Sequence, residues 1–116
     1  MQENKVILTW EAIYDVTDIA EYIESEFGIE RADCFQNEIK EQFEILGHSG
    51  GMFGKTQIYY AGYCIYKKPF LPSIIFYIIK ESEKEVHILR VLRDERDWNK
   101  ILTEQREYTY PQQVTD

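Results

Sequence analysis

Three arginines stand close together at the end of an apolar segment near the C-terminus. The segment from Val86 to Leu92 lacks the 3.6-residue rhythm of a surface helix and is β-branched enough to predict a strand buried on both faces. Arg90, Arg93 and Arg96 lie at its end. Guanidinium groups offer fixed planar donors, so this corner is a candidate binding surface. Solvated charges at a strand end explain the same residues equally well.

Asp97 and Trp98 follow these arginines directly. Asp97 can hold an arginine in place by a charge-assisted pair, and Trp98 can anchor a protein partner. The alternative is that both residues only fix the next short helix to the sheet. For Trp98 we favour this alternative, because aromatic side chains dominate protein cores.

A second candidate surface combines tyrosines with lysines in the middle of the chain. Its members are Tyr59, Tyr60, Tyr63, Tyr66, Lys67 and Lys68. Tyrosine presents an apolar ring and a polar tip, so Tyr63 beside Lys67 and Lys68 is suited to stacking on bases or anchoring a protein. Ordinary packing of half-buried strands is the commoner reason for such a cluster.

Other reactive residue types do not form a recognisable constellation. The two histidines and two cysteines are isolated from one another, which predicts no metal site, no cofactor and a reduced pair of small buried thiols. The glycine-rich stretch from 47 to 54 lacks the Gly-Lys-Ser/Thr ending of a phosphate-binding loop. No spacing of Ser, His and Asp suggests an activated nucleophile, so no catalytic residue is assigned.

The charge of the chain is unevenly distributed. The formal net charge is −8, yet residues 1–46 hold twelve acidic and three basic residues, whereas residues 47–79 hold three lysines and no acid. Such asymmetry predicts two electrostatically different faces, with anionic partners steered to the second half of the chain.

The length of 116 residues fits one domain. We assign residues 1–104 to that domain and residues 105–116 to a polar C-terminal tail. No apolar run is long enough to span a bilayer and the first ten residues do not resemble a secretory signal, so we expect a cytoplasmic protein without a membrane partner.

Periodicity predicts two helices joined as a hairpin. After an opening strand at Lys5–Thr9, apolar residues recur at steps of three and four up to Phe27, where Gly28 ends the first helix. A second helix begins near Glu30 and ends at Gly47. The two apolar stripes are Ile13, Val16, Ala20, Ile23 and Phe27 in the first helix, and Ala32, Phe35, Ile39, Phe43 and Leu46 in the second.

The remainder predicts three strands and a short helix. The strands are Ile58–Tyr66, Pro72–Lys80 and Glu85–Leu92, with a turn at Lys67–Leu71 and a connection at 47–54. Consecutive strands should pair as antiparallel hairpins. The fold class is therefore α+β, with the order strand-helix-helix-strand-strand-strand, a largely antiparallel sheet, a helical hairpin on one face and a short C-terminal helix.

The motifs in this order resemble a known family. The stretch VILTWEAIYDVTDIAEYIESEFG, the pattern A..F...I...F..L, then IIFYII and VHILRVLRDERDWNKIL are similar to the RelE/ParE superfamily of bacterial type II toxin-antitoxin toxins, and are closest to the ParE branch. The resemblance covers residues 5–103. The ParE branch usually has a histidine where this chain has Arg93.

The resemblance implies a plasmid-stabilization toxin that inhibits DNA gyrase by binding and is neutralised in complex with a cognate antitoxin. Alternatives are a RelE-like ribosome-dependent endonuclease of messenger RNA, and a degenerate, non-toxic module that binds a partner. The region GYCIYKKP lacks the arginine that RelE nucleases use, and Arg93 replaces a titratable group. We therefore favour an inhibitor over an enzyme, with Lys67, Lys68, Tyr63 and the arginine corner as candidate contacts.

Overall fold

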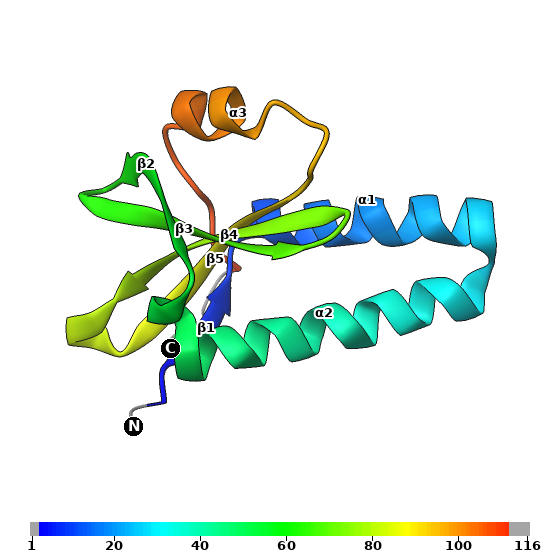
Figure 1. Ribbon diagram of the computed structural model, residues 1–116, viewed down its shortest axis with the longest axis horizontal. Helices are drawn as coiled ribbons and strands as arrows, with labels where there is room; N and C mark the ends of the chain where they lie inside the picture. Colours follow the sequence, from blue (N-terminus) through cyan, green and yellow to red (C-terminus); the bar gives the residue numbers. More distant parts are fainter. Residues whose placement is uncertain (1–2, 112–116) are drawn as a thin grey trace.

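The computed structural model describes residues 3–111 and has the predicted α+β fold. A five-stranded sheet has the order β1-β5-β4-β3-β2, in which β1 runs parallel to β5 and every other pair is antiparallel. The elements are β1 (Lys5–Leu8), α1 (Trp10–Phe27), α2 (Ile29–Ser49), β2 (Gly54–Tyr60), β3 (Tyr63–Phe70), β4 (Ser73–Lys80), β5 (Glu85–Arg93) and α3 (Trp98–Glu104). Figure 1 shows the helical hairpin and α3 on different sides of the sheet.

The helical hairpin covers what we call the first face of the sheet. Thr9 caps the start of α1, since its Oγ1 accepts a hydrogen bond from Ala12 N and donates one to Leu89 O, both at 2.9 Å. Gly28 joins the two helices with a φ of 98°, a conformation that side chains disfavour. Most of the predicted stripes form the core here, with Phe35, Ile39, Phe43 and Leu46 buried against Ile75, Tyr77, Ile88 and Val91, and with Val16 and Ile23 half-buried beside them.

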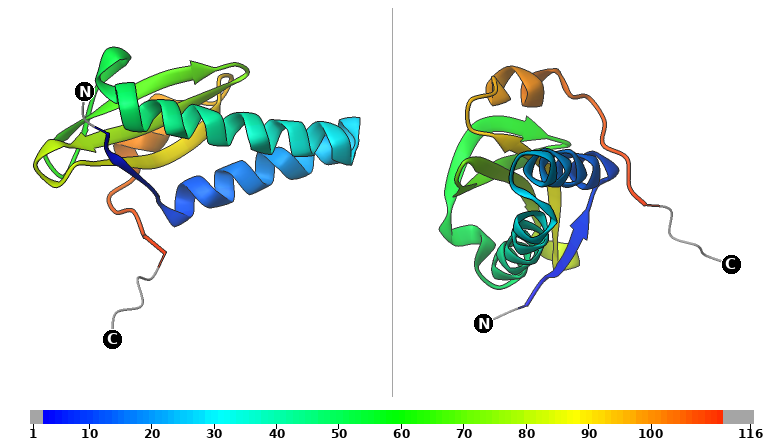
Figure 2. Two further views of the ribbon diagram at one scale, coloured as in Figure 1. Left: turned by 90° about the horizontal axis from the view of Figure 1, so that it is seen from below. Right: turned by 90° about the vertical axis from the view of Figure 1, so that its right-hand side faces the viewer.

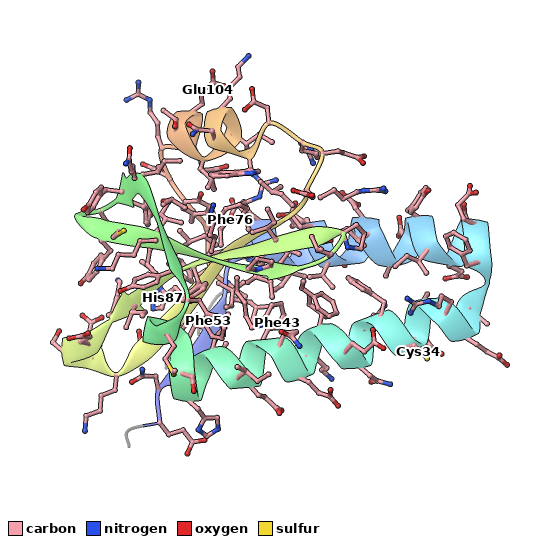
Figure 3. All side chains as sticks on the ribbon, in the orientation of Figure 1. Cys34, Phe43, Phe53, Phe76, His87 and Glu104 are labelled. Atoms are coloured by element: carbon pink, nitrogen blue, oxygen red, sulfur yellow. The ribbon has the colours of Figure 1, made fainter. Side chains whose placement is uncertain are left out.

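The second face of the sheet is covered by α3 and by the C-terminal segment Gln105–Pro111. Its core contains Ile65, Ile74, Phe76, Ile78, Leu89, Leu92, Leu102 and Tyr108. Figure 3 shows Phe76 on the side of α3 and Phe43 between α2 and the sheet. The run IIFYII is buried on both sides, as predicted, because β4 lies in the middle of the sheet.

Residues 105–111, which belong to the part predicted as a polar C-terminal tail, contribute buried side chains to the fold. Tyr108 is buried and packs edge-on against Tyr60, with ring centroids 4.8 Å apart. Trp10 N donates to Thr109 O at 2.8 Å, so this segment runs back beside the start of α1. Residues 112–116 of the predicted tail lie outside the described residues.

Two strand boundaries predicted from the sequence are wrong. Ile58–Tyr66 is not one strand, because Ala61 and Gly62 form a two-residue turn with φ values of 54° and 87°. Such left-handed turns suit the twist of antiparallel strands, but Ala-Gly is a weaker signal than Asn-Gly. The segment Lys67–Leu71 is correspondingly not a turn, since its first four residues belong to β3.

The second helix and one cysteine also differ from expectation. Gly47 does not end α2, which continues to Ser49. A Cβ at position 47 would lie 2.9 Å from Asn4 O, so glycine here permits close packing of α2 on the start of the sheet. Both cysteines are free, but Cys34 is exposed on α2 (Figure 3) because it lies beside the apolar stripe and not within it.

The left view of Figure 2 shows the hairpin extending past the end of the sheet, so that its tip stands clear of the strands, and the right view shows the two helices end-on. Within residues 3–111, no helix is both long and apolar enough to cross a membrane.

Candidate functional site

Arg90 is engaged inside the fold. Its Nε donates to Asp15 Oδ2 at 2.7 Å and its Nη2 to Asp15 Oδ1 at 2.9 Å, which forms a bidentate pair with α1. Val91 N also donates to Asp15, and Arg90 Nη1 donates to Gln105 Oε1 at 3.2 Å. Burial alone would lower the pKa of Arg90, but the hydrogen bonds and charge of Asp15 outweigh it, so the pKa is raised. Arg90 therefore joins β5, α1 and the C-terminal segment.

Arg93 lies three residues further along β5 and faces the hairpin. Its guanidinium carbon lies 4.8 Å from the centroid of the Tyr22 ring. Its Nε is buried and has no hydrogen-bond partner among residues 3–111. Glu95 Oε2 lies 3.5 Å from this nitrogen, longer than the ~2.7–2.9 Å of a charge-assisted hydrogen bond. The Glu95 side chain is 70% exposed, so solvent screens this weak pair.

The other corner residues have distinct roles. Arg96 is exposed and, with Arg93, lines a small hollow beside Asp18 of α1. Asp97 does not hold an arginine as predicted, because its Oδ1 accepts a hydrogen bond from Lys100 N and caps α3. Trp98 packs on Phe76 with ring centroids 5.2 Å apart, which is the structural role favoured for it.

The lysine and tyrosine cluster does not form one surface. Lys67 Nζ lies 5.0 Å from the centroid of the Trp98 ring on the second face. Lys68 projects to the first face, where its Nζ donates to Gln42 and lies 5.0 Å from the centroid of the Phe53 ring. Tyr63 packs against the second-face core, with Lys80 Nζ 5.4 Å from its ring centroid. Adjacent strand residues point to opposite faces, so the two lysines cannot converge on one phosphate.

The histidine in β5 is also occupied. His87 is buried, with Nε2 2.8 Å from Glu85 Oε1 and Nδ1 2.7 Å from the hydroxyl oxygen of Tyr110. Both ring nitrogens therefore have partners within the protein. In the described part of the chain, no three His, Cys, Asp or Glu side chains form a group able to hold a metal ion.

A groove, which the sequence did not predict, lies between the hairpin tip, the β3–β4 turn and the end of β5. Its volume is about 360 Å³. Phe35 and Phe70 lie along its base, and Phe27 and Leu71 stand at its rim with 67% and 72% of their surfaces exposed. Its charged lining residues are Arg31, Glu38 and Arg93. Phe27 is thus not core, although it continues the apolar stripe of α1.

The sequence matches the family model described as "ParE toxin of type II toxin-antitoxin system, parDE" over residues 6–98. This chain belongs to the ParE toxin family. A solved structure from the "Chromosomal ParDE TA system from P. aeruginosa" has the same fold, with a TM-score of 0.63 and 22% sequence identity over 78% of this chain and 96% of that one. No curated protein sequence matches this chain significantly.

The family match confirms the resemblance to the ParE branch and ends at the first residue of α3. The remainder of α3 and the C-terminal segment, which cover the second face of this ParE family member, lie beyond it. We take the end of β5 with its adjoining groove as the candidate site, because Arg93 Nε has no hydrogen-bond partner among residues 3–111 and Arg96 is exposed beside it.

Proposed function

We propose that this ParE family member is a cytoplasmic toxin that arrests growth by binding DNA gyrase and that a cognate antitoxin neutralises it. Family membership over residues 6–98 is the observation that carries the proposal. Gyrase is the target that the ParE branch implies. We propose that gyrase contacts the corner after β5, where Arg93 is half-buried and Arg96 is exposed.

Binding is favoured over RNA cleavage by the placement of the polar groups. Cleavage needs a positioned base and acid beside a cationic group that stabilises developing charge. His87 has both ring nitrogens occupied, and Lys67 and Lys68 project to opposite faces. The corner supplies guanidinium groups, a side-chain type that does not serve as a general base. These positions suit contacts to a protein surface.

The antitoxin is proposed to add a strand to the free edge of the sheet. The β2 strand lies at one end of the strand order and hydrogen-bonds only to β3 within the sheet. Strand addition satisfies the unpaired backbone groups of such an edge and supplies affinity through main-chain hydrogen bonds. The product of a small neighbouring gene should therefore form a stable complex with this chain. Failure of the two purified proteins to associate at micromolar concentration contradicts this part.

Expression in bacteria separates the possible targets. Cells should stop growing with DNA damage signalling and with intact transcripts. Arg93→Ala and Arg96→Ala should each weaken the arrest, while Arg106→Ala, which removes an exposed arginine outside the corner, should not. Circular dichroism and thermal unfolding verify that each variant is folded.

Two results would overturn the proposed mechanism. Cuts in messenger RNA at ribosome-occupied codons, abolished by Arg93→Ala, would identify a RelE-like endonuclease. Normal growth of cells that express the folded protein, combined with a stable complex with the neighbouring protein, would identify a non-toxic module that binds a partner.

A further inference from the structure

The C-terminal segment Gln105–Pro111 is attached to the rest of the fold mainly through side chains. It is neither helix nor strand, and it lies beyond the family match, which ends at residue 98. Apart from its first bond to α3, its backbone meets other backbone at one place within residues 3–111, where Trp10 N donates to Thr109 O at 2.8 Å. The right view of Figure 2 shows it descending from α3 past the start of α1. Segments with so few backbone bonds are among those that open at low cost.

The end of the segment is tied to both β5 and α1. The hydroxyl oxygen of Tyr110 lies 2.7 Å from Nδ1 of His87 in β5. Thr109 donates twice to Glu11 of α1, through its N at 3.0 Å and its Oγ1 at 2.9 Å, in a position exposed to water. These residues directly follow Tyr108, which is the buried residue of the segment. Three consecutive residues therefore carry the attachment.

Tyr108 anchors the segment at a cost. Its ring packs edge-on against Tyr60 on the second face, but its hydroxyl is buried without a hydrogen-bond partner among residues 3–111. A buried hydroxyl without a partner is unfavourable, and opening of the segment would return it to water. This cost offsets part of the gain from burying the ring, and so lowers the free energy of opening.

We propose that the C-terminal segment is a strap that opens and closes as one unit while the sheet and the helical hairpin stay folded. Trp10 is the first residue of α1, so its N–H has no acceptor within the helix and loses its partner at Thr109 when the segment opens. Tyr60 loses its cover at the same moment. The segment thus controls both the start of α1 and access to the second face. A molecule that binds only the open state would shift the equilibrium towards it.

Hydrogen exchange of single amides, followed by NMR in the full chain, tests the proposal. The amides of Trp10 and Thr109 are the two reporters, because each donates a bond that joins the segment to α1. The amide of Ala12 is the matched reference in the same helical turn, since it donates to Thr9 at a buried position. After correction for intrinsic rates, the two reporters should exchange at least about tenfold faster than the reference.

A substitution in the hairpin core separates opening of the segment from global unfolding. Ile39→Val removes one methylene group from the first-face core and destabilises the folded sheet and hairpin. It should speed exchange at Ala12 about threefold to tenfold. Exchange at Trp10 and Thr109 should stay unchanged, because the closed and open states both contain the intact core.

Substitutions within the segment should change the two reporter amides by the same factor. Tyr110→Phe removes the bond to His87 and should speed both about threefold to tenfold, although it touches neither of their own bonds. Tyr108→Phe removes the unsatisfied hydroxyl and should slow both by up to about fivefold. Tyr59→Phe alters a largely exposed tyrosine outside the segment, and should leave both rates as they are.

Two results would overturn the proposal. If Ile39→Val speeds the two reporters as much as Ala12, they exchange only when the whole protein unfolds. If Tyr110→Phe changes the two reporters by different factors, the contacts of the segment open independently and not as a unit. Neither result bears on the proposed target or antitoxin, which growth arrest and complex formation test separately.

Discussion

Arg90 and Arg93 lie three positions apart on the same strand, yet they differ in how their guanidinium groups are hydrogen-bonded within the fold. Arg90 makes a bidentate pair with Asp15 and a further bond to Gln105. Arg93 keeps a buried Nε without a hydrogen-bond partner in the described part of the chain and stacks on Tyr22 at the edge of an open groove. The fold therefore uses the guanidinium group of Arg90 for internal hydrogen bonds, whereas the Nε of Arg93 makes none among the described residues.

The register of the β4–β5 pairing explains why the two arginines have different surroundings. A shift in the β4–β5 pairing falls between Phe76 and Tyr77, so Tyr77 opposes Ile88 while Phe76 opposes Arg90. Such an irregularity changes the direction in which the neighbouring side chains point. Arg90 thereby reaches the N-terminal half of α1, and Arg93 returns to the first face opposite Ser73, next to the groove. Two arginines in a sequence motif are therefore not evidence of a common role.

The largest expected effect is at Phe35, which lies beneath the groove and belongs to the core. Its ring is buried and stacks on Phe70 with centroids 6.3 Å apart. Phe35→Ala should lower the free energy of unfolding by about 3–5 kcal/mol, since it leaves a cavity. Chemical denaturation measures this loss. The exposed neighbour Phe27 supplies the comparison, because Phe27→Ala should cost less than about 1 kcal/mol; equal losses would show that the groove is not open.

The next effect separates the two arginines directly. Asp15→Ala removes both carboxylate oxygens from Arg90 and the acceptor from Val91 N, and should destabilise the fold by about 3 kcal/mol because it leaves a largely buried charge unpaired. Arg93→Ala should change the free energy of unfolding by less than about 0.5 kcal/mol. Denaturation of both variants provides the measurement. A larger loss for Arg93→Ala than for Asp15→Ala would reverse the assignment of roles.

Much of the fold followed from local pattern, and much of the site did not. Two helices, their stripes and the order of elements were predictable because 3.6-residue periodicity and glycine positions act over short distances. The β2–β3 turn at Ala61 and Gly62 carries a weak signal, and missing it obscured which face Lys67 and Lys68 occupy. In a strand, a one-residue error exchanges the faces.

The pairing of Arg90 and the shape of the groove depend on residues far apart in the chain. Asp15 is 75 positions from Arg90. Tyr22, Arg31, Leu71 and Arg93 come from four different elements or turns, and none of the first three has a local motif that marks it. Only Arg93 and Arg96 were accessible from sequence, because they form a cluster at the end of an apolar strand.

Alkaline pH should weaken the C-terminal segment while leaving the Arg90 pair intact. Burial, with a smaller effect of nearby Tyr60, raises the pKa of Tyr110 to about 12. The folded state thus favours the neutral hydroxyl, so its contribution is complete below the ordinary pKa of about 10 and is lost as pH rises through about 12. The pKa of Arg90 is also raised, so its charge persists over this range.

Denaturation at several pH values measures this loss. Between pH 10 and 12 the stability of Tyr110→Phe should fall less steeply than that of the unchanged protein, whereas the exposed control Tyr59→Phe should follow the unchanged protein. Identical slopes for all three proteins would remove Tyr110 as a source of alkaline unfolding.

The smallest expected effect concerns a second unpaired group. The Tyr108 hydroxyl is buried without a hydrogen-bond partner among residues 3–111, but unlike Arg93 Nε it lies in the second-face core and not at a groove. Tyr108→Phe should therefore stabilise the protein by up to about 1 kcal/mol, because the unsatisfied hydroxyl is removed while the ring remains.

Tyr110→Phe, two residues away, is the matched comparison. It loses the bond to His87 at 2.7 Å and should destabilise by about 1 kcal/mol. Thermal unfolding at neutral pH distinguishes the opposite signs. Tyr108→Phe should also leave antitoxin affinity and growth arrest unchanged, since an unpaired group enclosed in the core offers nothing to a partner. Loss of either activity in a stable Tyr108→Phe protein would show that the second face, and not only the Arg93 corner, takes part in recognition.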